Sequence, residues 1–277
     1  MTKSLHTIAH SLFQPSRKIP NVTVTGVKLN SSQVDKGDLF IAIPGTKVDG
    51  HDFIDDAIDS GAIAIISNGR DVGKLSVPQI KVANPRRAAS IVAAEYYGHP
   101  TRDLIVLGIT GTNGKTTTAS LLYSILNNAG HKTAQLGTLG TIADGFIQEA
   151  TLTTPDSISL QKTFSKLRDA DFSHIVMEVS SHALDQYRVA DVEFDVALFT
   201  NLTPEHLDYH ASIEAYYQAK ARLFRMLPLE STAIVNESDP NGLRMAEETN
   251  APTLTFSSSN GDSIHFSDLN ISISGIH

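Results

Sequence analysis

The residues whose spacing most clearly predicts chemistry are the seven from Gly111 to Thr117, with the sequence Gly-Thr-Asn-Gly-Lys-Thr-Thr. The apolar run Leu104 to Ile109 before them is typical of a buried strand, and the segment from Lys115 onward has helical periodicity. Glycines between a strand and a helix let backbone N–H groups face a phosphate, Lys115 adds positive charge, and the Thr116 hydroxyl can ligate magnesium. We therefore predict a loop that binds the phosphates of ATP together with Mg2+.

The loop departs from the usual GxxxxGK[ST] spacing, because Gly108 lies one position too early. The alternative is that Gly-Lys-Thr merely opens a helix after a tight turn. The preceding strand and the threonine-rich first helical turn favour the phosphate loop.

The elements that must position this loop alternate between strand and helix along the chain. Short β-branched apolar runs predict strands at Leu39–Ile43, Ala62–Ile66, Leu104–Ile109, Ile175–Val179, Val196–Phe199 and Ala233–Val235. Helical periodicity predicts helices at Ile54–Ser60, Arg87–Tyr97, Lys115–Ala129, Ile158–Ala170 and Ile213–Leu227. This alternation predicts an α/β fold with mainly parallel sheets.

Composition narrows the class of protein. The 277 residues carry a formal charge of -8, which argues against binding along a nucleic-acid backbone. The absence of cysteine excludes disulfides, thiolate metal sites and cysteine nucleophiles. The N-terminal segment is too polar for a signal peptide, and no apolar run approaches the roughly 18 residues that a membrane span needs. We expect a cytoplasmic protein with no membrane partner.

The length favours two domains, and the segment Gly98–Arg102 is the expected boundary between residues 1–100 and 101–277. Near the chain end, Leu269–Ile273 alternates apolar and polar residues like a half-exposed strand, and the chain stops four residues later. Two interpretations stay open: an edge strand at a natural terminus, and a truncated chain. We expect the second.

The loop and five spaced blocks downstream of it resemble the Mur ligase superfamily, and among its members the tripeptide-forming branch, MurE. Besides Gly111–Thr117, the resemblance is carried by Leu152–Asp156, Met177–Leu184, Gln186–Arg188, Thr200–His210 and Tyr217–Arg222. In the N-terminal part, Leu29–Ser32, Gly37–Gly45 and Asp49–Gly50 are similar to the family's uridine-nucleotide-binding domain, although Asn30 and Ser32 stand where Asp and Arg are common.

The resemblance implies an ATP-dependent ligase of peptidoglycan synthesis. Such an enzyme adds meso-diaminopimelate or L-lysine to UDP-N-acetylmuramoyl-L-alanyl-D-glutamate (UDP-MurNAc-L-Ala-D-Glu) by way of an acyl phosphate. It further implies a small N-terminal UDP-MurNAc-binding domain, a central ATP-binding domain, here incomplete, and a third domain that is absent. We expect the protein to be a monomer, and we expect the 277 residues by themselves to be inactive. The alternatives are a folylpolyglutamate synthetase-like ligase and a non-catalytic nucleotide-binding module.

The substrate contacts are carried over from the family's motifs. They are Leu29, Ser31, Thr46, Lys47 and Val48 for the uridine nucleotide, and Thr153, Thr154, Ser180, Gln186 and Arg188 for the nucleotide-sugar peptide. Hydroxyls and arginines suit diphosphate and carboxylate groups. Each residue of the second group alone has another interpretation, because Ser and Thr also cap helices and Arg188 could form a surface ion pair.

Four residues are the catalytic candidates: Lys115, Glu178, His206 and Lys220. Glu178 ends a predicted strand at its carboxyl edge, where ligands bind in open α/β sheets, and with Thr116 it would make an oxygen-rich magnesium site. The alternative is a solvated or ion-paired glutamate.

The resemblance implies that His206 binds a second Mg2+ together with Lys220, which is carbamylated in the family. By itself Lys220 would pass as a snorkelling surface lysine. His210 lies four residues after His206, and for it a metal-ligand role and a packing role both stay open.

Overall fold

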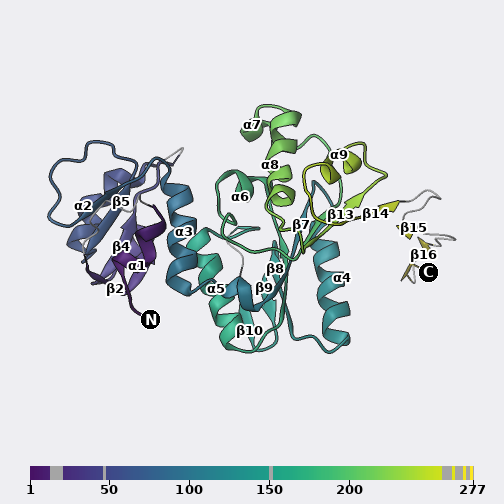
Figure 1. Ribbon diagram of the computed structural model, residues 1–277, viewed down its shortest axis with the longest axis horizontal. Coiled ribbons are helices and arrows are strands. Elements are labelled where there is room, and N and C mark those ends of the chain that lie inside the picture. The colour runs from purple at the N-terminus through teal and green to yellow at the C-terminus, as the bar shows by residue number, and fades with distance from the viewer. Residues whose placement is uncertain are drawn as a thin grey trace. The chain divides into compact units, whose positions relative to one another are not determined.

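The structure is a computed structural model that describes residues 1–12, 21–45, 48–149 and 152–257, and the backbone of 264–265, 271–272 and 275–276. The chain forms two compact units (Figure 1). The first comprises Met1–Asp103, Pro155–Asp171 and Asp185–Val192, and the second comprises Leu104–Thr154, Phe172–Leu184 and Glu193–His277. The predicted domain bounds, 1–100 and 101–277, stay a prediction.

A few sequence expectations fall outside the described residues or at their margin. Thr46 and Lys47 lie outside them, as does most of the strand expected at 269–273. Within the described ranges, none of the helices is long and apolar enough to cross a bilayer.

The first unit is built on a parallel sheet of four strands in sequence order. Its strands are β3 (Gly26–Lys28), β4 (Asp38–Ile41), β5 (Ala64–Ser67) and β6 (Gln79–Lys81). Its helices are α1 (Leu5–Ala9), α2 (Ile54–Asp59), α3 (Pro85–Tyr97) and α5 (Ser157–Asp169), with short 3-10 turns at His10–Leu12, Ser31–Gln33, Gly50–Phe53 and Pro100–Asp103. A two-stranded antiparallel ribbon joins β1 (Lys3–Ser4) to β2 (Thr23–Val24).

Helices cover both faces of this sheet. Leu39 and Ile41 of β4 share a core with α1 and α3, whereas Phe40 belongs to a second core with α2. Alternate residues of a strand point to opposite faces, so a strand buried on both sides is apolar throughout. This is why the sequence of β4 shows no alternation.

The second unit carries a nine-stranded sheet in the order β10-β9-β8-β11-β7-β12-β13-β14-β15. The strands are β7 (Ile105–Thr110), β8 (Thr133–Gly137), β9 (Gly140–Ala143), β10 (Phe146–Gln148), β11 (His174–Glu178), β12 (Val196–Phe199), β13 (Thr232–Asn236), β14 (Thr253–Ser257) and β15 (Ile264–His265). The pairings β8–β9 and β9–β10 are antiparallel and the others are parallel, which confirms the predicted α/β class with a mainly parallel sheet. A separate antiparallel pair joins β16 (Ile271–Ser272) to β17 (Gly275–Ile276).

The helices described in this unit are α4 (Lys115–Asn128), α6 (Ser181–Asp185, whose last residue belongs to the first unit), α7 (Leu207–His210), α8 (Ile213–Arg225) and α9 (Gly242–Ala246). Ala119 of α4 packs on Ile109 and Val176 at one face of the sheet. Leu223 of α8 packs against Gly108 of β7, where a Cβ would collide with Phe194 and approach Leu223. A glycine inside a strand here allows close approach of the helix.

Helix starts follow capping residues in the sequence. Asn84, Asp156 and Ser212 each accept a hydrogen bond from backbone N–H groups in the first turn of α3, α5 and α8. Gly98 ends α3 in the left-handed conformation that glycine favours.

The carboxyl ends of β7, β11 and β12 meet at one edge of the sheet, because these three strands are parallel neighbours. The chain leaves β7 toward β8 on one side, and β12 later extends the sheet on the other. Reversals of this kind create a crevice in which α/β proteins bind ligands.

Candidate functional site

The phosphate loop connects β7 to α4 as the sequence predicts. Gly111 has φ +148° and Gly114 has φ +85°, values that disfavour any side chain. A Cβ at Gly111 would also collide with the Thr200 hydroxyl. Gly114 caps α4, and the N–H groups of a first helical turn have no partner within the helix. The loop therefore presents N–H donors and the positive end of the helix dipole to an anion.

Asn201 holds two amides of this loop. Its carbonyl oxygen accepts Thr112 N–H at 2.9 Å, and its side-chain oxygen accepts Asn113 N–H at 2.9 Å. Its side-chain nitrogen donates to Asn113 O at 3.1 Å. The amides of Thr112 and Asn113 are thus engaged, and the donors left for a phosphate are those of residues 114–117. Sequence reasoning did not single out Asn201, although it lies in the quoted block Thr200–His210.

Two lysines converge on the loop. Lys115 Nζ donates to Gly111 O at 2.9 Å and to Thr112 O at 2.7 Å, and Lys220 Nζ donates to Gly111 O at 2.7 Å. Lys220 is 1% exposed, and its ammonium lies 4.4 Å from the centroid of the Tyr216 ring. It is therefore a buried residue and not a snorkelling surface lysine.

Burial lowers the pKa of both lysine side chains. Burial, followed by the charge of Lys115, holds the pKa of Lys220 well below the ordinary lysine value. Burial also lowers the pKa of Lys115, although the carboxylates of Glu178 and Glu205 oppose this effect. The lowered pKa makes the neutral amine of Lys220 less unfavourable than that of a lysine exposed to water.

Glu178 ends β11 and is 1% exposed. Its Oε2 accepts the Thr116 hydroxyl at 2.9 Å, and Oε1 accepts the Thr138 N–H at 2.9 Å, while the Thr138 hydroxyl donates to Oε2 at 3.2 Å. A Cβ at Gly137 would collide with this carboxylate, so the glycine makes room for it. Glu178 is buried among hydroxyl and amide donors, which excludes the solvated interpretation.

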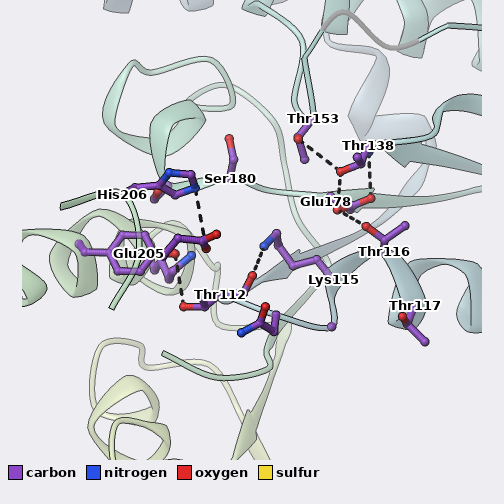
Figure 2. Close-up of a pocket in the computed structure, with 15 residues that line it drawn as sticks. Thr112, Lys115, Thr116, Thr117, Thr138, Thr153, Glu178, Ser180, Glu205 and His206 are labelled. Atoms are coloured by element: carbon purple, nitrogen blue, oxygen red, sulfur yellow. Dashed lines mark hydrogen bonds and ion pairs between the residues drawn. The ribbon is translucent and has the colours of Figure 1, made fainter. Parts of the chain in front are cut away.

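The donor set fits a hard cation. The oxygens of Glu178, Thr116, Thr138 and Thr153 gather at one side of the pocket, and Mg2+ prefers oxygen ligands, often one or two carboxylates with substrate phosphates (Figure 2). Within the described ranges, no group of three or more His, Asp or Glu side chains could hold a metal ion by itself. A magnesium ion here would thus depend on hydroxyl and phosphate oxygens besides Glu178.

His206 and His210 have different environments. His206 adopts a left-handed backbone, with φ +54°, just before α7, and its half-exposed side chain faces the pocket beside Glu205 (Figure 2). His210 is buried, and its Nε2 lies 2.9 Å from Ser181 Oγ. The ring centroid of His182 lies 4.9 Å from that of His206 and 5.5 Å from that of His210.

The phosphate loop, Glu178, His206 and Lys220 line one cavity of about 350 Å³. Its lining includes these predicted residues: Thr112, Asn113, Gly114, Lys115, Thr116, Thr117, Thr153, Glu178, Ser180, His206 and Lys220. It also includes four residues that sequence reasoning missed: Thr138, Ser181, Glu205 and Tyr216. Figure 2 shows the Lys115 side chain reaching between Glu178 on one side and Glu205 with His206 on the other.

Three predicted substrate contacts, Thr154, Gln186 and Arg188, are not among the residues that line this cavity. Thr154 is 1% exposed and donates its hydroxyl to Glu178 O at 2.9 Å. Gln186 and Arg188 belong to the first unit, where Arg188 donates to Gln186 Oε1 at 2.8 Å.

A second cavity, of about 320 Å³, lies in the first unit. Leu29, Ser31 and Val48, three of the predicted uridine contacts, line it together with Asn30, Phe40, Ile43, Gly50 and Phe53. Apolar side chains such as Phe40 and Ile43 beside the polar Asn30 and Ser31 suit a flat base with polar edges.

Family models match both parts of the chain. Residues 109–276 match the Mur ligase middle domain, and residues 23–97 match the model described as Mur ligase family, catalytic domain. Among curated proteins, the UDP-N-acetylmuramoyl-L-alanyl-D-glutamate--2,6-diaminopimelate ligase of Parabacteroides distasonis is 41% identical over 240 residues, which is 86% of this chain and 49% of that protein. The chain spans about half the length of the curated relatives it matches.

Solved structures of Mur ligases also match the fold of this chain. A UDP-N-acetylmuramoyl-L-alanyl-D-glutamate--2,6-diaminopimelate ligase matches with a TM-score of 0.85 at 26% identity, over 100% of this chain and 57% of its own. The MurF ligase of Thermotoga maritima in complex with ADP matches with a TM-score of 0.59 at 27% identity, over 88% of this chain and 52% of its own.

Proposed function

The chain belongs to the Mur ligase family, and on that premise we propose that it forms part of an ATP-dependent ligase of peptidoglycan synthesis. The reaction adds a third amino acid to UDP-N-acetylmuramoyl-L-alanyl-D-glutamate. The names of the relatives favour 2,6-diaminopimelate over lysine as the incoming amino acid.

One observation carries this proposal: the phosphate loop, the buried carboxylate of Glu178 and the buried amine of Lys220 line the same cavity. A non-catalytic nucleotide-binding module has no need to bury both of these groups beside its phosphate loop, because each costs free energy to desolvate. The match of residues 23–97 to a Mur ligase model speaks against the folylpolyglutamate synthetase-like alternative.

The proposed chemistry has two steps. A substrate carboxylate oxygen attacks the γ-phosphorus of ATP, giving an acyl phosphate and ADP. The neutral amine of the incoming amino acid then attacks the acyl carbon, and phosphate leaves as the tetrahedral intermediate collapses to an amide and a proton is lost. Such transfers depend on charge neutralisation and alignment, and they need no protein nucleophile.

The chain's own groups supply that neutralisation. We assign the N–H groups of residues 114–117 and the Lys115 ammonium to the ATP phosphates, since these donors face the cavity. Lys115 must leave the carbonyls of Gly111 and Thr112 to reach a phosphate, which a long flexible side chain can do.

Thr116 and Glu178 would hold one Mg2+, and His206 with Lys220 a second. When bound, magnesium neutralises phosphoryl charge and aligns the attacking and leaving oxygens. For Lys220 this requires its neutral amine to attack CO2 and lose a proton, which yields an N-carboxylate. The burial that lowers the pKa of Lys220 favours the neutral amine that this step needs.

The remaining assignments concern the second substrate. We assign the cavity of the first unit, with Leu29, Ser31 and Val48, to the uridine nucleotide. Thr46 and Lys47 are proposed contacts of the same ligand, and Thr153, Thr154, Ser180, Gln186 and Arg188 are proposed contacts of the muramoyl dipeptide.

The direct test is phosphate release by the whole protein supplied with ATP, UDP-MurNAc-L-Ala-D-Glu and, in turn, diaminopimelate or lysine. We expect phosphate release with one amino acid and not the other, and absence of release with both would refute the proposal. The 277-residue chain by itself is expected to bind both nucleotides without completing ligation.

The role of Lys220 has its own test. Lys220→Ala in the whole protein should lose ligation, and the wild type should gain activity when bicarbonate is added after CO2 has been removed. Equal activity of the mutant would remove the proposed role.

A further inference from the structure

Ser181 lines the nucleotide cavity and forms with His210, behind it, a buried polar pair that the proposed reaction does not use. Ser181 Oγ and His210 Nε2 lie 2.9 Å apart, with the residues 2% and 7% exposed. Ser181 is the first residue of α6, three positions after Glu178, and His210 is the last residue of α7. The pair thus joins the segment that follows β11 to the segment that carries His206.

The Ser181 hydroxyl has hydrogen-bonding capacity to spare. It lines the cavity, and among the described residues His210 is its one hydrogen-bond partner. A hydroxyl offers one proton and two lone pairs. If His210 donates its Nε2–H, Ser181 accepts that bond and keeps its own proton for a ligand.

The negative charge of the expected ligands decides which group donates in the bond between His210 and Ser181 and in the bond between Ser181 and a ligand. Phosphates, an acyl phosphate and carboxylates offer only acceptor oxygens, and bonds to ionised acceptors are the strong ones. A Ser181 proton donated to such an oxygen leaves a lone pair for His210 Nε2–H, and each bond in a chain of this kind polarises the next.

We propose that His210 is a positioning residue that donates Nε2–H to Ser181, so that Ser181 donates its proton to an anionic phosphoryl or carboxylate oxygen bound in the cavity. The inference rests on the proposed function, because that function supplies the anionic ligand.

The surroundings of His210 keep its imidazole in place. Its ring centroid lies 4.8 Å from that of Tyr209, 5.1 Å from that of Tyr216 and 5.5 Å from that of His182. Rings packed this closely leave no room for the imidazole to swing away from Ser181. Packing therefore serves the proposed role of His210, because it keeps Nε2 of His210 beside Ser181 Oγ.

The test uses two replacements that place an amide at different positions. His210→Gln puts its N–H donor near the former Nε2, whereas His210→Asn puts it near the former Nδ1, out of reach of Ser181. Ser181→Ala and the double variant Ser181→Ala/His210→Asn complete a cycle. Dissociation constants are measured for the 277-residue chain with a non-hydrolysable ATP analogue and Mg2+, and separately with UDP-MurNAc-L-Ala-D-Glu.

We expect Ser181→Ala to weaken one of the two ligands by about tenfold, the effect of losing a hydrogen bond to a charged group. The ligand that is weakened identifies the anionic oxygen as phosphoryl or carboxylate. His210→Gln should bind within about twofold of wild type, His210→Asn should weaken the same ligand as Ser181→Ala, and the double variant should be no weaker than Ser181→Ala.

Three results would overturn the inference: unchanged affinity of Ser181→Ala for both ligands, equal losses in His210→Gln and His210→Asn, or additive losses in the double variant. Thermal unfolding of each variant separates a folding defect from a binding defect, and Ser181→Ala still decides the matter if His210→Asn does not fold. A wild-type chain that binds neither ligand contradicts the proposed function, and the inference falls with it.

Discussion

Replacing Asn201 by alanine tests whether the loop after β12 holds the phosphate loop in its binding conformation. The Asn201 side chain makes two hydrogen bonds to the peptide groups of Asn113, at 2.9 and 3.1 Å. Each is worth about 1 kcal/mol net, so the ordered loop loses about 2 kcal/mol of stabilisation. A nucleotide must then supply that ordering free energy on binding, which corresponds to roughly thirtyfold weaker affinity.

The assay is calorimetric titration of the 277-residue chain with a non-hydrolysable ATP analogue and Mg2+. Asn127→Ala is the matched control, because Asn127 also donates to a carbonyl, that of Tyr123, and accepts a backbone N–H, that of Thr133, but near the far end of α4. We expect the control to lose stability and keep its affinity. If Asn201→Ala bound the analogue as tightly as wild type, the phosphate loop would hold its shape without Asn201 and the reasoning would fail.

Three further predictions concern charge, pH and packing. Glu178→Gln should abolish most of the magnesium dependence of nucleotide affinity while raising the magnesium-free affinity, because a buried negative charge near the phosphates is removed; titration with and without Mg2+ measures both. Burial and then the charge of His131 lower the pKa of His174, with Asp195 opposing, so the folded state resists protonation and stability falls as the pH drops below about 6.5. His131→Gln should reduce that loss in urea unfolding at acid pH, and an unchanged acid sensitivity would contradict the assignment. Phe164→Ala, at a fully buried position of α5, should lower the free energy of unfolding by about 3–5 kcal/mol in chemical denaturation followed by circular dichroism, and a loss below about 1 kcal/mol would show that the site is not tightly packed.

The strands buried on both faces could be predicted from the sequence because their apolar runs are continuous. Val196–Phe199 is β12 with the predicted bounds, and the run at Ile175–Val179 is β11 shifted by one residue. The phosphate loop can be predicted for a related reason, since glycine and lysine between such a strand and a helix have few other uses.

Strand β8 could not be predicted in the same way. Its sequence, Thr-Ala-Gln-Leu-Gly, has neither a β-branched run nor an alternating pattern, and its burial comes from neighbours distant in sequence. The omission matters for the site, because the turn after β8 carries Thr138, which donates two hydrogen bonds to Glu178.

Residues whose roles depend on hydrogen bonds to other residues could not be predicted either. Asn201 and Ser181 lie inside blocks that the sequence marked, yet nothing in their residue types shows that one binds the Asn113 peptide and the other His210. Such roles arise from three-dimensional proximity, as with Lys220, whose burial reversed the interpretation that its helix position suggested.

The claim on which every other assignment depends is that residues 114–117 and Lys115 bind the phosphates of a magnesium nucleotide. Calorimetry of the wild-type chain and of Lys115→Ala with a non-hydrolysable ATP analogue, with and without Mg2+, tests it most directly. We predict magnesium-dependent affinity in the wild type that is lost in Lys115→Ala. Equal affinity of the two chains, or wild-type affinity that does not respond to magnesium, would contradict it.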